Sequence, residues 1–294
     1  RLRLDALEIR NATLDVPESD EPFELPRWPE SLPQIQMPLA IQADTLVIDG
    51  FAISQAGKPV IDIHRGRGGI DIGNGYFLAE KLAIDTDRGR FNANGGYAPG
   101  KRYRTDLVVT GVFPAPAVKA PARLGLVARG DIDRMEMALA GNAPAPVRVL
   151  LTLRGAENPT WHFTGKTERL DLAALAVTED SLPLAFDLKA DGAGGKATLR
   201  GTLVQDQITL VIDPSQVAIA DEVLTVEPLV VRAFEGITTL RGRADFKDPA
   251  KPVFRFAVNA RGLRWGDSAD TAIGASADLG VAGHLKQWAA VGKA

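Results

Sequence analysis

The stretch DRGRFNANGGYAPGKRYRTDL, residues 87–107, decides the class of fold. Its strand-like residues are interrupted by Gly89, Gly95, Gly96 and Gly100. A glycine inside a strand has no side chain to pack, and it tends to mark a β-bulge or a sharp bend. We therefore interpret the glycines as points at which a long sheet bends.

Apolar and polar residues alternate with a period of two over most of the chain. In VFRFAVNARG, residues 253–262, Phe254, Phe256 and Val258 alternate with Arg255 and Asn259. This pattern is typical of a half-buried strand. Turn signals such as APG, DGAGG, DPS, KDPAKP and RGD separate the runs, as in consecutive hairpins. The sequence predicts an all-β, antiparallel protein.

Helical patterns are scarce, and the best of them is TERLDLAALAV, residues 167–177. Thr167 could cap its first turn, and Pro183 lies beyond its end. We expect at most one or two short helices. The glycine-rich run DGAGGKAT, residues 191–198, lacks the spacing of a phosphate-binding loop, so it predicts a hairpin turn.

Two glycine-broken segments, about 74–111 and 221–262, resemble one another. A shift of 147 positions aligns Leu82 with Leu229 and Gly95 with Gly242. Self-similarity of this kind indicates a repeat architecture. We expect residues 1–294 to form one elongated, repetitive β domain.

Three structures could cover the dry face of such a sheet: a second sheet, closure of the sheet into a barrel, or an apolar ligand in an open trough. Aromatic residues make up only 6% of the chain, which favours the trough. The candidate groove residues are the apolar positions of four alternating runs. They are Leu107, Val109, Leu151, Leu153, Leu184, Phe186, Leu188, Phe254, Phe256 and Val258.

A proline-rich loop, residues 16–38, is the most distinctive segment without strand character. It contains Phe23, Trp28 and Met37 among several acidic residues. One interpretation is a surface loop with its aromatic side chains against the sheet edge. The other is a flap over the trough.

Composition argues against several functions. The formal net charge of −3 gives no basic field that would attract nucleic acid, so we expect no nucleic-acid partner. The chain has no cysteine, and His64, His162 and His284 lack the spacing of zinc ligands. No apolar run approaches the ~20 residues that span a bilayer. We find no catalytic constellation, and we expect no enzyme activity, cofactor or metal.

The chain resembles the TamB family, the inner-membrane subunit of the translocation and assembly module and part of the AsmA-like group. The resemblance lies in RLRLDALEIRNATLDV, in the proline-rich insertion, and in phrases such as ADTLVIDGFAI, ERLDLAAL and ADLGVAGHLKQW. It implies a curled, taco-like β-sheet with an apolar interior, in the periplasm of a Gram-negative bacterium. It also implies that this chain, which begins at Arg1, is a fragment of a longer inner-membrane-anchored protein.

Two functions follow from this resemblance. The first is a lipid conduit, in which phospholipid or another acyl-chain lipid lies on the apolar face between the inner and outer membranes. The alternative is a scaffold for assembly of outer-membrane proteins, acting with a BamA-type partner through a part of the protein outside this chain. We expect the fragment to be a monomer.

Overall fold

The computed structural model describes residues 2–17, 28–29, 32–37, 39–114, 120–176, 182–248, 251–265, 273–284 and 287–294. Within these ranges the protein is all-β, with eighteen strands and one four-residue α-helix, which confirms the predicted class. Tertiary contacts divide the chain into two units. Unit 1 comprises Arg1–Asp20, Trp28–Pro159 and Thr167–Pro183, and unit 2 comprises Glu21–Arg27, Thr160–Lys166 and Leu184–Ala294. The single domain expected from the sequence stays a prediction.

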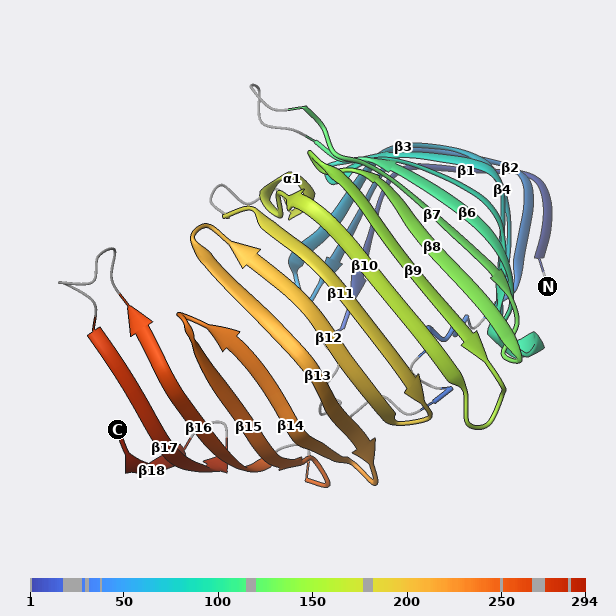
Figure 1. Ribbon diagram of the computed structural model, residues 1–294. Coiled ribbons are helices and arrows are strands. Elements are labelled where there is room, and N and C mark those ends of the chain that lie inside the picture. The colour runs from blue at the N-terminus through green and yellow to red at the C-terminus, as the bar shows by residue number, and fades with distance from the viewer. Residues whose placement is uncertain are drawn as a thin grey trace. The chain divides into compact units, whose positions relative to one another are not determined.

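Unit 1 contains nine complete strands, and β10 (Thr160–Leu170) spans the boundary between the two units. The nine are β1 (Leu2–Val16), β2 (Ile41–Gln55), β3 (Lys58–Gly73), β4 (Tyr76–Thr86), β5 (Gly89–Ala98), β6 (Arg104–Val112), β7 (Arg123–Gly130), β8 (Arg134–Asn142) and β9 (Pro146–Arg154). A 3-10 turn, η1 (Pro99–Lys101), joins β5 to β6. From β2 to β9 each strand pairs antiparallel with the next, and the strands bend along their length (Figure 1).

The first pair departs from the expected antiparallel pattern, because β1 and β2 are parallel, with Leu2 opposite Ile41. A parallel pair needs a crossover of a dozen or more residues to return the chain to the starting end. Residues 17–40, most of which belong to the proline-rich loop, form that crossover. The loop therefore has a topological role that neither sequence interpretation included.

Unit 2 is a meander in which each strand pairs antiparallel with the next. Its strands are β11 (Leu184–Ala193), β12 (Lys196–Gln205), β13 (Ile208–Ala220), β14 (Val223–Ala233), β15 (Gly236–Asp245), β16 (Val253–Trp265), β17 (Ile273–His284) and β18 (Gln287–Lys293). Ala193 pairs with Lys196 across the DGAGG segment, which confirms the predicted hairpin turn there.

The DPS segment, residues 213–215, was wrongly predicted to be a turn, since it lies inside β13. Ser215 is completely buried, and its hydroxyl donates to the carbonyl of Asp213 at 2.7 Å. The same hydroxyl accepts a hydrogen bond from the amide of Val230 on β14 at 2.9 Å. Beside Pro214, which cannot donate a backbone hydrogen bond, the Ser215 hydroxyl thus provides the acceptor that the neighbouring strand β14 uses.

The helix α1 (Ala173–Ala176) lies within the predicted helical segment but begins later than expected. Thr167 is not its cap, because this residue is buried within β10. Instead, the carboxylate of Asp171 accepts a hydrogen bond from the amide of Ala173 at 3.0 Å, in the manner of an N-cap. Residues 167–170 instead continue the strand β10, so the helix begins after them.

Two clusters of buried apolar side chains stabilise unit 1. One joins Leu46 and Ile48 of β2 to Ala79 and Leu82 of β4. The other places Ala174 of α1 against side chains at one end of β7 to β9. Its buried members are Ala122, Ala143, Val147 and Ala174. The helix therefore covers one end of the same face that carries the first cluster.

No helix in the described part of the chain is long and apolar enough to cross a lipid bilayer.

Candidate functional site

Each unit has one apolar sheet face, which can be followed through the strand register. Residues directly opposite each other on paired strands project from the same side of a sheet. In unit 1, Leu107 is opposite Ala128, which is opposite Met137, which is opposite Leu151. In the adjacent row on the same side of the sheet, Val109 is opposite Leu126. The candidates Leu107, Val109, Leu151 and Leu153 therefore share one face of unit 1.

The six remaining candidates share one face of unit 2. Phe186 is opposite Leu203, which is opposite Leu210, and Phe256 is opposite Gly242 and Val281. Following the register across the meander gives one continuous apolar surface. Its larger members are Leu184, Phe186, Leu188, Leu199, Leu203, Leu210, Ile212, Val217, Leu224, Val226, Leu229, Val231, Leu240, Phe254, Phe256, Val258, Leu279 and Val281.

The large side chains of this unit 2 face are mostly only partly buried. Phe186, Leu188, Phe254 and Phe256 all retain solvent exposure. Among the described residues, both clusters of buried apolar side chains belong to unit 1. The unit 2 face therefore keeps apolar surface that a ligand or partner could cover, at roughly 25 cal/mol per Å² buried.

Glycines on the unit 2 face make room for aromatic rings on neighbouring positions. A Cβ atom at Gly192 would lie 2.2 Å from the ring of Trp161, and one at Gly242 would lie 2.7 Å from the ring of Phe256. Ring atoms therefore occupy the space that a Cβ at each of these glycines would fill.

Bulges allow both units to keep apolar residues on one face where strict alternation fails. Ala79 and Leu82 are three positions apart, so regular alternation would place them on opposite faces. Both are buried, at 1% and 6% exposed, because β4 bulges between them opposite β5. Ala43 and Leu46 are buried in the same way on either side of a bulge in β2.

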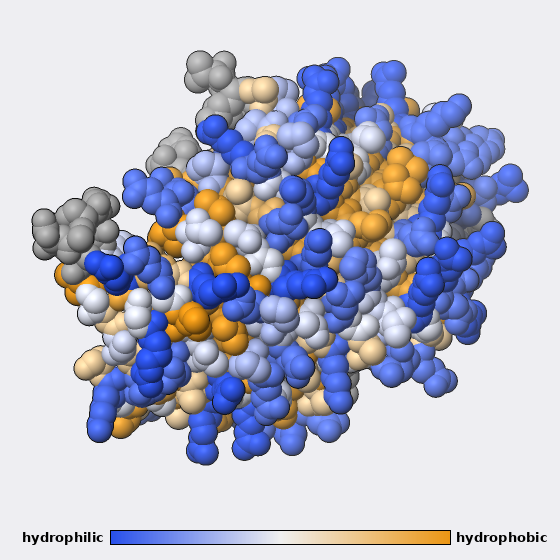
Figure 2. Space-filling view, viewed as in Figure 1, coloured by the Kyte–Doolittle hydropathy of each residue, from blue (hydrophilic) through white to orange (hydrophobic). Residues whose placement is uncertain are grey.

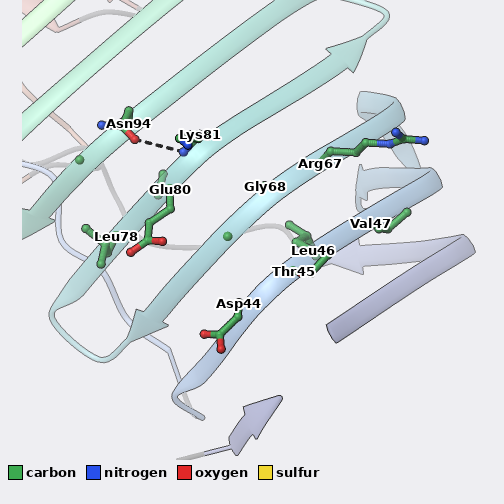
Figure 3. Close-up of a pocket in the computed structure, with 13 residues that line it drawn as sticks. Asp44, Thr45, Leu46, Val47, Arg67, Gly68, Leu78, Glu80, Lys81 and Asn94 are labelled. Atoms are coloured by element: carbon green, nitrogen blue, oxygen red, sulfur yellow. Dashed lines mark hydrogen bonds between the residues drawn. The ribbon is translucent and has the colours of Figure 1, made fainter. Parts of the chain in front are cut away.

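The bulges of β2 and β4 border a hollow of about 790 Å³, which Arg67, Gly68 and Gly69 of β3 also line. Figure 3 shows the side chains of Asp44 and Glu80 in this hollow and the amide of Lys81 bonded to the side-chain oxygen of Asn94, at 3.1 Å. Lys81 has a φ of 48°, which the bulge imposes. Asp44, Glu80, Lys81 and Asn94 are exposed, so this hollow opens away from the buried cluster.

The face opposite the candidate groove is mainly polar but not uniformly so. Figure 2 shows apolar surface over the region of β6 to β9 among hydrophilic side chains. The register places Val108, Val127, Ala138 and Leu150 in one row there, and Val108 and Leu150 are 37% and 42% exposed. This apolar row on the polar face was not predicted from the sequence.

The described part of the proline-rich loop is fastened to the turns at one end of unit 1. The indole of Trp28 donates to the carbonyl of Ala156 at 2.6 Å, and the hydroxyl of Tyr97 donates to the carbonyl of Pro33 at 2.8 Å. The side-chain amide of Gln34 donates to the hydroxyl of Tyr103 at 2.8 Å. Tyr97 is opposite Phe77 on the apolar face, so this part of the loop borders that face at one end of the strands.

Burial, with a smaller effect from Tyr103, raises the pKa of Tyr97 to about 12. The phenol therefore stays a hydrogen-bond donor to the loop at neutral pH. Phe23, which the sequence analysis placed in the same loop, lies outside the described residues.

Several prominent members of the apolar faces were missed from the sequence. Leu46 and Leu82 flank bulges, where the alternation that identified the other residues is interrupted. Trp161 lies in TWHFTG, where bulky residues follow each other without clear alternation. The glycine at position 192 was a usable signal, since it leaves room for that indole ring.

Comparison of the chain with protein-family models gave no match, and comparisons with curated proteins and with solved structures gave none either. The TamB-like pattern therefore rests on the sequence features alone and stays a prediction.

Proposed function

We propose that the apolar faces hold the acyl chains of phospholipid or a similar lipid, as part of a lipid conduit in the bacterial periplasm. The observation that supports this best is the continuous face of unit 2, whose large aliphatic and aromatic side chains remain partly exposed. An acyl chain gains roughly 0.8 kcal/mol for each CH₂ group that it buries. Contact with a few such rows would hold a lipid without any polar recognition site.

The test is site-specific photo-crosslinking on opposite faces of unit 2. A benzophenone amino acid at Phe256 or Phe186 should capture phospholipid from vesicles. The same group at Arg255 or Asp187 should not, because these neighbours project from the other face. Mass spectrometry of the adducts gives the measurement. Absence of lipid adducts at both Phe256 and Phe186 would overturn the proposal.

A melting curve separates lipid binding from folding. We expect Phe256→Asp to abolish capture of lipid by a benzophenone group at Val258, two residues along the same face, while the melting temperature stays nearly unchanged, because an exposed face can keep the carboxylate solvated. Unfolding of the variant would mean that protein covers this position.

The alternative is a scaffold that pairs with another β-strand during protein assembly. The specific observation in its favour is β18, whose seven residues are all exposed and include Trp288 and Val291, at 63% and 76% exposed. Crosslinks from β18 to a protein, with no lipid adduct on either apolar face, would favour this function.

A further inference from the structure

The polar face of unit 1 contains a block of side chains on β3, β4 and β5 with an unusual arrangement of charge. Arg65 is opposite Asp85, which is opposite Arg90. In the neighbouring row, Arg67 is opposite Ala83, which is opposite Asn92. The two rows bring three guanidinium groups and one amide around the small side chain of Ala83.

This block encloses a hollow of about 390 Å³. Arg65, Arg67, Asp85, Arg90 and Asn92 contribute to its lining. Ala83 forms part of its floor, and a methyl group leaves the space between the longer side chains unfilled. The hollow is therefore a consequence of one small residue between two rows of long polar ones.

The charges around the hollow are not balanced. Arg65 forms an ion pair with Asp85 at 3.4 Å. Within the described chain, the guanidinium groups of Arg67 and Arg90 have neither an ion-pair nor a hydrogen-bond partner. Figure 3 shows that Arg67 extends away from Asp44 and Glu80, so these two carboxylates do not neutralise it. Asp49 is opposite Arg65 on β2, on the far side from Ala83.

We propose that this hollow binds a phosphate group, either as inorganic phosphate or as the headgroup of an anionic lipid. Arg67 and Arg90 come from strands two spacings apart, about 10 Å, with Ala83 between the strands. Two guanidinium groups can therefore approach one ligand from opposite sides. The planar fork of arginine matches phosphate oxygens in a bidentate way, and Asn92 supplies a further N–H donor.

Phosphate fits this arrangement better than a single carboxylate does. A carboxylate has two oxygens in one plane, which one arginine can satisfy. A tetrahedral phosphate offers oxygens to both sides at once. The site lies on the face opposite the apolar one, so it does not depend on the proposed acyl-chain binding.

The test compares the double variant Arg67→Gln/Arg90→Gln with the matched control Arg104→Gln/Arg148→Gln. The control removes the same charge from exposed positions of β6 and β9 outside the hollow. Two probes distinguish the sources: inorganic phosphate in calorimetry, and phosphatidylcholine vesicles with and without phosphatidic acid in co-sedimentation. Both are measured at low and at moderate salt, because exposed charges are screened beyond about 10 Å at 0.1 M.

We expect the Arg67/Arg90 variant to weaken binding of at least one probe about tenfold. The control should weaken it less than about twofold, because single exposed charges contribute little. Binding of phosphate alone would assign a soluble ligand, and dependence on phosphatidic acid would assign a lipid headgroup. Equal losses in the two variants, or no binding of either probe to the unmodified protein, would overturn the proposal.

Discussion

The hairpin of β4 and β5 in unit 1 and the hairpin of β14 and β15 in unit 2 have the same local pairing but different surroundings. Leu82 is opposite Ala93, and 147 positions later Leu229 is opposite Leu240. Each hairpin has a register shift directly before that leucine, after Ala79 in one and after Val226 in the other.

Burial separates the two hairpins. Leu82 belongs to a buried cluster with Leu46 and Ile48 of β2, whereas Leu229 remains partly exposed. The two hairpins thus share a register, whereas the neighbouring strands determine how deeply each leucine is buried. Whether the two segments are a true repeat stays a prediction.

The largest expected effect comes from shortening the two equivalent leucines. Leu82→Ala should lower the free energy of unfolding by about 2–5 kcal/mol, because it leaves a cavity in a buried cluster. Leu229→Ala should cost only about 1 kcal/mol, since its side chain is already partly solvated. Chemical denaturation of the two variants gives the comparison. Equal losses would show that the unit 2 face is as closely covered as the unit 1 cluster.

Replacing a glycine at the bend should have the next largest effect. Gly95 has a φ of 104°, and a Cβ there would lie 1.9 Å from the carbonyl oxygen of Asp106. We expect Gly95→Ala to cost about 2 kcal/mol or more, from backbone strain and displacement of β6.

Gly125 provides the matched control on a nearby strand. A Cβ at Gly125 would meet nothing closer than 3.8 Å, so Gly125→Ala should change stability by less than about 0.5 kcal/mol. Thermal melting of the two alanine variants decides the point, and similar melting temperatures would contradict the role assigned to Gly95.

The smallest effect concerns the loop attachment, which distinguishes the first hairpin from the second. Tyr97 bonds to Pro33, whereas the position 147 residues later is Ala244, which has no hydroxyl. The pKa of Tyr97 is raised from 10 to about 12, so the folded state favours the neutral phenol. Its contribution to stability is therefore present below pH 10 and is lost as the pH rises from 10 to 12.

We expect this loss to be below about 1 kcal/mol, because the phenol is only partly screened from solvent. Unfolding measured across this pH range should show it, and Tyr97→Phe should remove the part of the pH dependence that Tyr97 causes. An identical pH profile in the variant would rule out this contribution.

Alternation in the sequence was sufficient to place all ten groove candidates on an apolar face of their unit. It worked because runs such as residues 253–258 keep a strict period of two along a regular strand. Their role in lipid binding stays a prediction. Alternation is misleading at Ala79 and Leu82, because the bulge between them adds one residue to β4 and so reverses the apparent face.

Proline was also a misleading signal within β13. Asp213, Pro214 and Ser215 have the composition of a turn, but Ser215 supplies an acceptor that keeps β13 paired with β14.

The parallel pairing of β1 and β2 has no local signature, because it depends on where a long crossover returns the chain. The arginine hollow was likewise invisible from the sequence, since its residues come from three strands.

The crossover between β1 and β2 has a consequence for the order of folding. From β2 to β9, each strand can pair with its predecessor after closing only a short connection, so contacts accumulate locally and quickly. β1 must wait until residues 17–40 have returned the chain, which carries the entropy of closing a long loop. β1 precedes β2 in the chain but is thus expected to join it late, on the edge that the meander provides.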